Sequence, residues 1–162
     1  MNELPRTLKV VTVWLLLGLV LFLGFQYWEH RQQQTRFVAD NGVIEIRRAP
    51  DGHYHWPGSI NGKAVDFLID TGATRSALPM DLARRLNLDV LDTVQSSTAG
   101  GVVTGEVVRA DVSLQGGVLA QRLPMVALSG LSDHPLLGMD VLGKLRWSQG
   151  QGVLRIDAAT PP

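Results

Sequence analysis

The sequence contains no cysteine, which excludes disulfide bonds, thiolate nucleophiles and zinc sites built on thiolates. It also has no excess of charge of either sign, because 15 lysines and arginines balance 15 aspartates and glutamates. A chain without net charge gives no general reason to expect a nucleic acid as a partner. Charged residues are missing altogether from residues 10–28, and this long apolar run has a direct interpretation.

Residues 10–28, VVTVWLLLGLVLFLGFQYW, predict a single membrane-spanning helix that ends in an aromatic pair suited to a membrane interface. A buried core helix is one alternative. A cleaved signal peptide is another, but the run is long for one and lacks a small-residue cleavage site. A slight excess of positive charge before the run places residues 1–9 in the cytoplasm. The polar residues 29–40 predict a stalk, and residues 159–162 a short tail.

The chain between the stalk and the tail, residues 41–158, predicts an all-β body. Its apolar residues recur with a period of two, and turn signals interrupt them at short intervals. Asn61-Gly62 is the strongest hairpin signal, and Gly116-Gly117 marks another. Two short helices are expected, over residues 79–88, with proline in the first turn, and within 137–145. Strands are expected over residues 42–48, 53–60, 63–69, 105–114, 118–128 and 152–156.

The stretch FLIDTGATRSALP, residues 67–79, places Asp70 at the end of an apolar strand. A carboxylate buried there is costly unless something compensates it, which makes Asp70 a candidate catalytic residue. Gly72 lets another backbone or a ligand approach closely, and its N–H can donate to the carboxylate. The hydroxyl of Thr71 can hydrogen-bond neighbouring backbone and lock the loop.

The body resembles the retropepsin-like aspartic proteases, specifically the bacterial, membrane-anchored type. Four segments carry the resemblance in the order of the family: FLIDTGA (67–73), SSTAGGVVTGEV (96–107), HPLLGMDVLGKL (134–145) and GVLRI (152–156). The resemblance implies a closed, β-barrel-like single lobe with one or two short helices. It also implies a bacterial inner-membrane protein whose body lies in the periplasm.

The resemblance implies a role for each residue of the motif. Asp70 is the expected catalytic aspartate, and Thr71, Gly72 and Ala73 complete its loop. Without the motif upstream, the glycines at 100 and 101 would be interpreted as an ordinary hairpin turn. With it, a substrate-covering flap is expected at Ala99, Gly100, Gly101, Val102 and Val103.

The chain also departs from the viral members of the family. Thr74 and Met139 stand where those members commonly carry an acid and an arginine that pair, so this ion pair is missing. The chemistry needs two close carboxylates, one ionised and one protonated, but the chain has one such loop. Asp140 lies on a predicted helix with no strand to aim it at Asp70, so we do not expect it to be catalytic. A homodimer with two copies of Asp70 is therefore expected.

The expected function is a membrane-anchored aspartic endopeptidase that hydrolyses protein or peptide substrates without metal or cofactor. Water activated by the paired Asp70 carboxylates would attack the peptide bond. The alternative is a catalytically inactive module of the same fold that dimerises or binds peptides. An intact Asp-Thr-Gly favours the enzyme, because a binding module does not need a stressed carboxylate.

Three other features suggest chemistry but have simpler interpretations. His53 and His55 lie on one face of a strand with a spacing that suits a metal, but no third ligand is obvious, so no metal site is expected. Ser76 has no histidine in register and no glycine elbow, so it is not expected to be a nucleophile. His134 is interpreted as an ordinary loop histidine.

Overall fold

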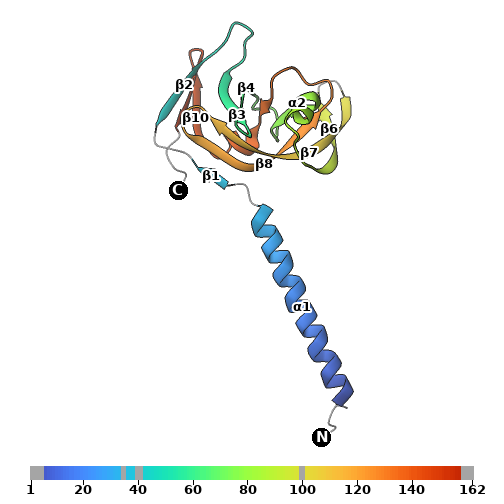
Figure 1. Ribbon diagram of the computed structural model, residues 1–162. Coiled ribbons are helices and arrows are strands. Elements are labelled where there is room, and N and C mark those ends of the chain that lie inside the picture. Colours follow the sequence, from blue (N-terminus) through green and yellow to red (C-terminus); the bar gives the residue numbers. More distant parts are fainter. Residues whose placement is uncertain (1–5, 34–35, 39–41, 99–100, 158–162) are drawn as a thin grey trace. The chain divides into compact units, whose positions relative to one another are not determined.

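The computed structural model describes residues 6–33, 36–38, 42–98 and 101–157, and the chain divides into two compact units, residues 1–34 and 35–162. The first unit is the helix α1, Arg6–Gln33 (Figure 1). Large apolar side chains are exposed along it, with Trp14 at 67% and Leu15 at 70% exposure. Within the described ranges, no helix meets both the length and the apolarity that crossing a membrane demands. The predicted anchor over residues 10–28 is therefore a helix, but its crossing of a membrane is not supported.

The second unit is built almost entirely from strands. Its two described helices are short, α2 (Met80–Arg85) and α3 (Met139–Leu142). The strands are β1 (Arg36–Val38), β2 (Val43–Arg47), β3 (His55–Ile60), β4 (Lys63–Ile69), β5 (Ala77–Pro79), β6 (Val90–Thr98), β7 (Gly101–Leu114), β8 (Val118–Leu128), β9 (Leu136–Leu137), β10 (Arg146–Gly150) and β11 (Val153–Asp157).

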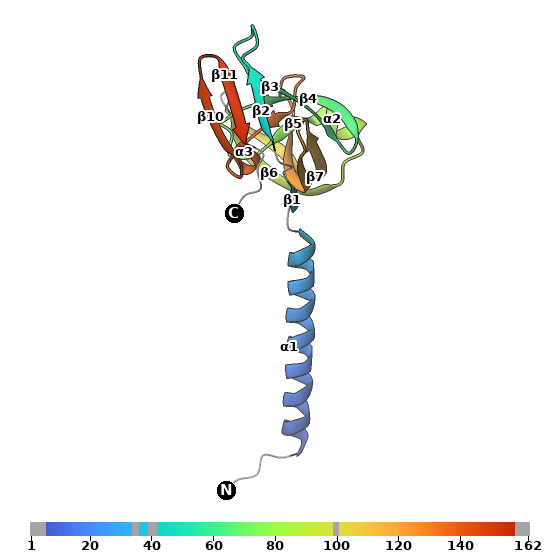
Figure 2. The same ribbon diagram turned by 90° about the vertical axis from the view of Figure 1, so that its left-hand side faces the viewer.

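Six of these strands close into a barrel. The ring runs β8-β5-β9-β4-β3-β7, and the pairing of β7 with β8 closes it, while β1 and β6 extend it as outer strands. The second sheet has the order β10-β11-β2 and lies beside the barrel in Figure 2. Trp56 from β3 lies opposite Phe67 from β4, and both side chains are fully buried in the core. The predicted all-β, closed-barrel architecture with short helices is confirmed.

Both expected hairpin turns form where the sequence places them. Asn61 and Gly62 have φ values of 48° and 78°, the paired positive values of a type I′ turn, and they connect β3 to β4. Gly116 and Gly117 also have positive φ, 95° and 85°, between β7 and β8. Glycine adopts this region without the steric cost that other residues carry, so these turns set the register of the two longest barrel pairings.

The segment predicted as a stalk, residues 29–40, contains the end of α1 and the strand β1. Helix α1 continues to Gln33, since the residues that follow the apolar run include good helix formers. Residues 36–38 form β1, which pairs antiparallel with β8, Arg36 opposite Gln121. β1 forms because the edge of β8 offers backbone hydrogen-bonding groups to it. The polar composition of residues 29–40 gives no sign of this pairing.

The predicted helix over residues 79–88 is shorter at both ends. Pro79 is not in its first turn but is the last residue of β5, where it pairs in parallel with Leu128 of β8. Its φ of −58° and ψ of 136° are extended, and the helix begins at Met80. Strand pairing within the barrel, a tertiary interaction, decides this boundary in place of local propensity.

Candidate active site

Asp70 lies directly after β4, in the loop where β4 and β9 run in parallel. Its main-chain N–H donates to the carbonyl of Leu137 at 3.0 Å, which continues the ladder by one residue beyond Ile69. The N–H of Gly72 donates to Asp70 Oδ1 at 2.9 Å, and the N–H of Ala73 to the Asp70 carbonyl at 3.2 Å. The side chain is half-buried, so a rigid strand end presents a carboxylate with one oxygen already oriented.

The other predicted loop residues surround this carboxylate. Thr71 and Gly72 are exposed and Ala73 is half-buried. A Cβ built on Gly72 would lie 3.2 Å from Asp70 Oδ1, so a side chain there would crowd the carboxylate. The carbonyl of Ala73 accepts a hydrogen bond from the N–H of Met139 at 2.8 Å, which ties the loop to α3.

Asp140 anchors the loop from the other side. Its Oδ1 accepts the Ser76 hydroxyl at 2.7 Å, and its Oδ2 accepts the Ser76 N–H at 2.9 Å. The Ser76 oxygen in turn accepts the N–H of Gly138 at 3.1 Å, and Ser76 has no exposed surface. We call these three residues the Ser76–Asp140–Gly138 clamp. Ser76 is therefore inaccessible as a nucleophile, and Asp140 is engaged in holding the loop.

Gly138 fits between two backbone segments of the same loop. A Cβ at this position would lie 2.6 Å from the carbonyl carbon of Arg75 and 2.9 Å from the carbonyl oxygen of Ala73. Neither atom can move without shifting the Asp70 loop, so Gly138→Ala is expected to destabilise the chain by about 2 kcal/mol. Urea unfolding measures this. Gly150→Ala, where a Cβ would meet no atom within 4 Å, is the matched control, and equal stability of the two variants would contradict the expectation.

The predicted flap coincides with the hairpin of β6 and β7, in which Thr98 pairs with Gly101. Gly101 has a φ of 113°, which favours glycine. Val102 is exposed at 69%, whereas Val103 points inward onto a small apolar cluster formed by Ala77, Val126 and Leu128. The predicted flap residues Ala99 and Gly100 lie outside the described residues.

The positions of the missing viral ion pair are both at the surface. Thr74 is exposed, and its carbonyl accepts the N–H of Asp140 at 3.1 Å. Met139 is exposed at 37%. Main-chain hydrogen bonds and the clamp therefore make the connection between the loop and α3.

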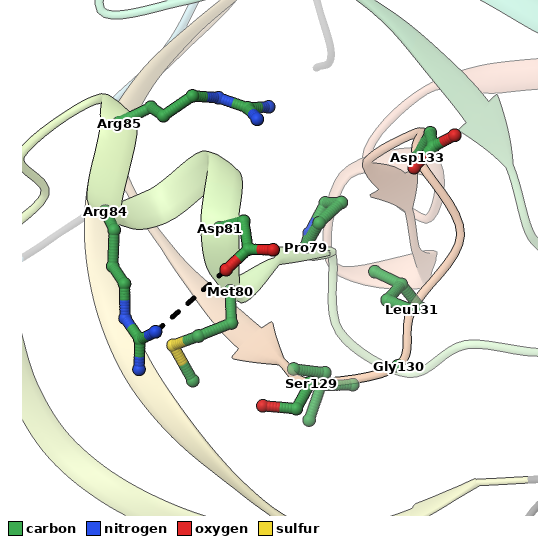
Figure 3. A pocket seen from close by; sticks show the side chains of 10 residues that line it. Pro79, Met80, Asp81, Arg84, Arg85, Ser129, Gly130, Leu131 and Asp133 are labelled. Carbon is green, nitrogen blue, oxygen red and sulfur yellow. Dashed lines mark ion pairs between the residues drawn. The ribbon is translucent and has the colours of Figure 1, made fainter.

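Two cavities formed by described residues are not lined by Asp70. One of about 490 Å³ lies between α2 and the loop after β8, and its lining includes Asp81, Arg84 and Asp133 (Figure 3). A second, of about 210 Å³, is lined by Thr71 and Trp147 among others. Asp70 is absent from both linings, although its neighbours Ile69 and Thr71 line the second cavity.

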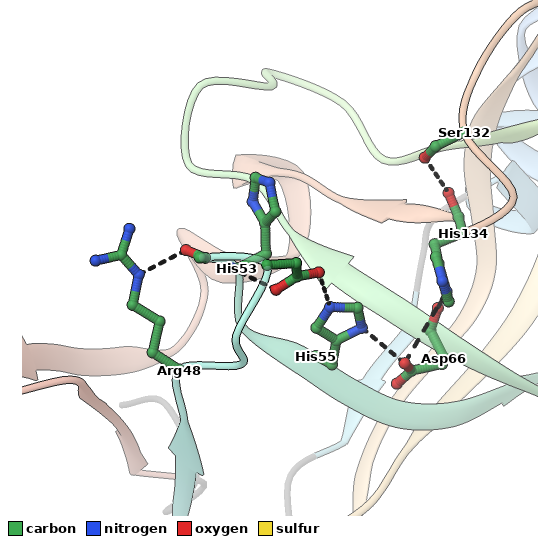
Figure 4. A network of polar contacts seen from close by, with 8 residues as sticks. Arg48, His53, His55, Asp66, Ser132 and His134 are labelled. Atoms are coloured by element: carbon green, nitrogen blue, oxygen red, sulfur yellow. Dashed lines mark hydrogen bonds and ion pairs between the residues drawn. The ribbon is translucent and has the colours of Figure 1, made fainter.

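A network of imidazoles and carboxylates joins β3 and β4 to two neighbouring loops (Figure 4). The two ring nitrogens of His55 each lie 2.7 Å from a carboxylate oxygen, Nδ1 from Asp66 and Nε2 from Asp51. Hydrogen bonds to Asp51 and to Asp66 raise the pKa of His55. The pKa of Asp51 is lowered by the His53 N–H and by the His55 side chain.

The prediction that His53 and His55 lie on one face of a strand is wrong, because β3 begins at His55 and His53 precedes it. The His53 ring points away from His55, whose neighbour is instead His134 from the loop before β9 (Figure 4). The two rings are 5.3 Å apart and perpendicular. Asp66 and His134 were missed by sequence reasoning because they lie 11 and 79 positions from His55 in the numbering, and only the barrel brings them together.

Known proteins match this chain at the level of sequence and fold. The family described as "gag-polyprotein putative aspartyl protease" matches residues 56–144. An uncharacterized protein of Rickettsia prowazekii is 26% identical over 160 residues, covering 90% of this chain and 68% of its own length. An uncharacterized protein of Sinorhizobium, from the 5′ region of cobV, is 26% identical over 162 residues, covering 88% of this chain and 69% of its own length.

A solved structure has the same fold. The retropepsin-like aspartic protease from Rickettsia conorii superposes with a TM-score of 0.59 at 24% identity, covering 76% of this chain and 93% of its own. The family match spans more than half of the chain and includes the Asp70 loop and the clamp. The chain therefore belongs to the retropepsin-like aspartic protease family.

Proposed function

We propose that the chain is an aspartic endopeptidase whose site forms from two copies of Asp70. The observation that carries the proposal is the placement of Asp70. A parallel strand pair and the Gly72 N–H hold its carboxylate at an open surface, within the segment that matches the family. Among the described residues, no hydrogen bond or ion pair joins Asp70 to a second carboxylate of its own chain. A second copy is the simplest source of the required partner.

One carboxyl of the pair would act as a general base and the other as a general acid. Two carboxyl groups brought together in such a dimer would not both ionise readily, so one would stay protonated at a pH where the other is charged. The ionised Asp70 would take a proton from water, and the protonated copy would donate to the scissile carbonyl oxygen. Thr71 would brace the paired loops, and Gly72 would offer backbone groups to an extended peptide.

The β6–β7 hairpin is the proposed cover of the substrate. Its exposed Val102 and inward Val103 alternate as in a strand that faces a ligand on one side. An extended peptide beneath it could pair with strand backbone, and Gly101 at the start of β7 suits a hinged element.

A cleavage assay tests the activity. The full chain, in detergent where needed, is incubated with a mixed peptide library between about pH 4 and 7. Cleavage that depends on Asp70 is the expected result. Cleavage of equal extent by wild type and Asp70→Asn would contradict the proposal. If both are inert while the chain is dimeric, the alternative of an inactive binding module is favoured.

We also propose that α1 attaches the chain to a membrane. The support is the uncharged run over residues 10–28 and the exposed apolar side chains that line the helix. A single crossing, with the second unit in the periplasm of a bacterium, remains a prediction from the charge distribution.

Cell fractionation checks the attachment. The full chain is expected in the membrane fraction and to resist alkaline carbonate washing, because the exposed apolar side chains favour lipid over water. The chain from residue 35 onward, which retains the compact second unit, is expected in the soluble fraction. Recovery of both forms in the soluble fraction would refute membrane attachment.

A further inference from the structure

The outer face of the β3–β4 hairpin carries donor atoms that the proposed peptidase does not use. His55 lies opposite Leu68 in the register, and Asp66 opposite Pro57, so both side chains lie on the face away from the buried Trp56 and Phe67. His134 reaches the same point from the loop before β9 (Figure 4).

We propose that His55, Asp66 and His134 bind a divalent transition-metal ion of the zinc class. Each residue offers one ligand atom, and these atoms all lie within 4.8 Å of one another. Ligands of tetrahedral zinc lie about 2.0–2.2 Å from the ion, hence roughly 3.3–3.5 Å apart. The distances from Asp66 Oδ2 to His55 Nδ1 and His134 Nδ1, 2.7 Å and 4.0 Å, bracket that spacing.

The surroundings of His55 are those of a metal-binding imidazole. While Nδ1 faces the proposed ion, Nε2 lies 2.7 Å from Asp51 Oδ2. A carboxylate that accepts the second ring N–H fixes the orientation of the imidazole and raises its basicity. Asp51 is thus a positioning residue for this site.

Hydrogen bonds and ion pairs within the single chain are the alternative explanation of this geometry. A protonated His55 between Asp51 and Asp66 accounts for both 2.7 Å contacts. The Nδ1 of His134 lies 4.0 Å from Asp66 Oδ2 and can donate to the Asp66 carbonyl at 3.2 Å, a hydrogen bond that metal binding would have to replace. We favour the metal ion because it would use one atom from each of the three side chains at once.

Binding would exchange protons in a defined way. The His55 Nδ1 proton would be released to water, and the His134 proton would be carried on Nε2, which frees Nδ1 for the ion. Two nitrogens and one oxygen favour zinc, cobalt, nickel or copper over magnesium and calcium, which prefer oxygen ligands. The ligands are partly exposed, with side-chain exposures of 21%, 41% and 44%, so water can fill the fourth position.

The site would join the two segments that support Asp70. His134 precedes Pro135, whose carbonyl accepts the Leu68 N–H at 2.8 Å. Leu136 and Leu137 then pair with β4 immediately before Asp70. An ion shared by Asp66 and His134 would therefore fasten this loop to β4 and stiffen the base of the Asp70 loop.

Metal titration of the untagged full chain tests the proposal. Binding of Zn²⁺ is measured by competition with a chromophoric chelator, and Co²⁺ is added separately to record the visible absorption of a tetrahedral site. One equivalent is expected to bind. His55→Gln and His134→Gln are each expected to weaken binding at least about tenfold, and Asp51→Asn to weaken it about tenfold. His53→Gln, whose ring points away, is the matched control and is expected to bind as wild type.

The outcomes separate the metal site from the ion-pair network. If the wild-type chain binds no Zn²⁺, or if His134→Gln binds it as tightly as wild type, the proposal is overturned. His134 lies in a surface loop, so its variant carries the test even if His55→Gln does not fold. No peptide is present in the measurement, so its result is independent of the proposed peptidase activity.

Discussion

Asn in place of Asp70 is expected to lower kcat/KM for peptide cleavage by about 10³-fold or more. An amide cannot take a proton from water at any pH of the assay, so the general base is lost from both halves of the proposed site. The Gly72 N–H can still donate to the amide oxygen, so the fold should persist. Steady-state cleavage and circular dichroism measure the two effects. Asp89→Asn, an exposed carboxylate on the loop before β6, is the matched control.

Mixing the two proteins tests whether the site is shared. If one active site needs an intact Asp70 from each copy, equal amounts of wild type and Asp70→Asn pair at random and leave about a quarter of the activity. If each copy carries its own site, about half remains. The assay follows activity after subunit exchange at constant total protein, and a value of one half would rule out the shared carboxylate pair.

Asp140→Ala is expected to destabilise the chain by about 3 kcal/mol. The substitution leaves both the N–H and the hydroxyl of fully buried Ser76 without their acceptor, and unsatisfied buried donors cost about 1–3 kcal/mol each. The loss should appear in urea unfolding as a lower midpoint at unchanged slope.

Two further variants separate the clamp from a general surface effect. Asp140→Asn retains one oxygen acceptor and should cost less than Asp140→Ala. Asp81→Ala, whose side chain is 84% exposed on α2, should change stability by no more than about 0.5 kcal/mol. If Asp140→Ala and Asp81→Ala have the same free energy of unfolding, the clamp does not hold the loop.

The sequence predicts the parts of the fold that depend on local chemistry. Asn61-Gly62 predicts its turn because few other residue pairs tolerate two positive φ values, and the register of β3 and β4 follows from it. β5 and β9 were not predicted, because strands of three and two residues have no period of their own. They exist through pairing with β8 and β4, which a local pattern cannot show.

The candidate site also has one part that the local sequence predicts and another that depends on contacts between distant segments. Asp70 could be found from its neighbours, since a carboxylate followed by glycine at the end of an apolar strand is a local signal. The partners of Ser76 and His55 could not, because Asp140 and His134 come from distant segments. That Asp140 is not a second catalytic acid stays a prediction, and its part in the clamp depends on a contact that only the closed barrel makes.

The clamp also constrains the order in which the molecule can assemble. Ser76 and Asp140 are 64 residues apart, so the loop around Asp70 gains this anchor only after the residues between them have been synthesised. Contacts between such distant segments form late, because the entropy of closing the intervening chain must be overcome first. A nascent chain that ends before Asp140 therefore has Asp70 but not the frame that orients it. Until Asp140 has been added, a growing chain cannot make the contacts that hold this loop, so the frame of Asp70 depends on residues synthesised long after Asp70 itself.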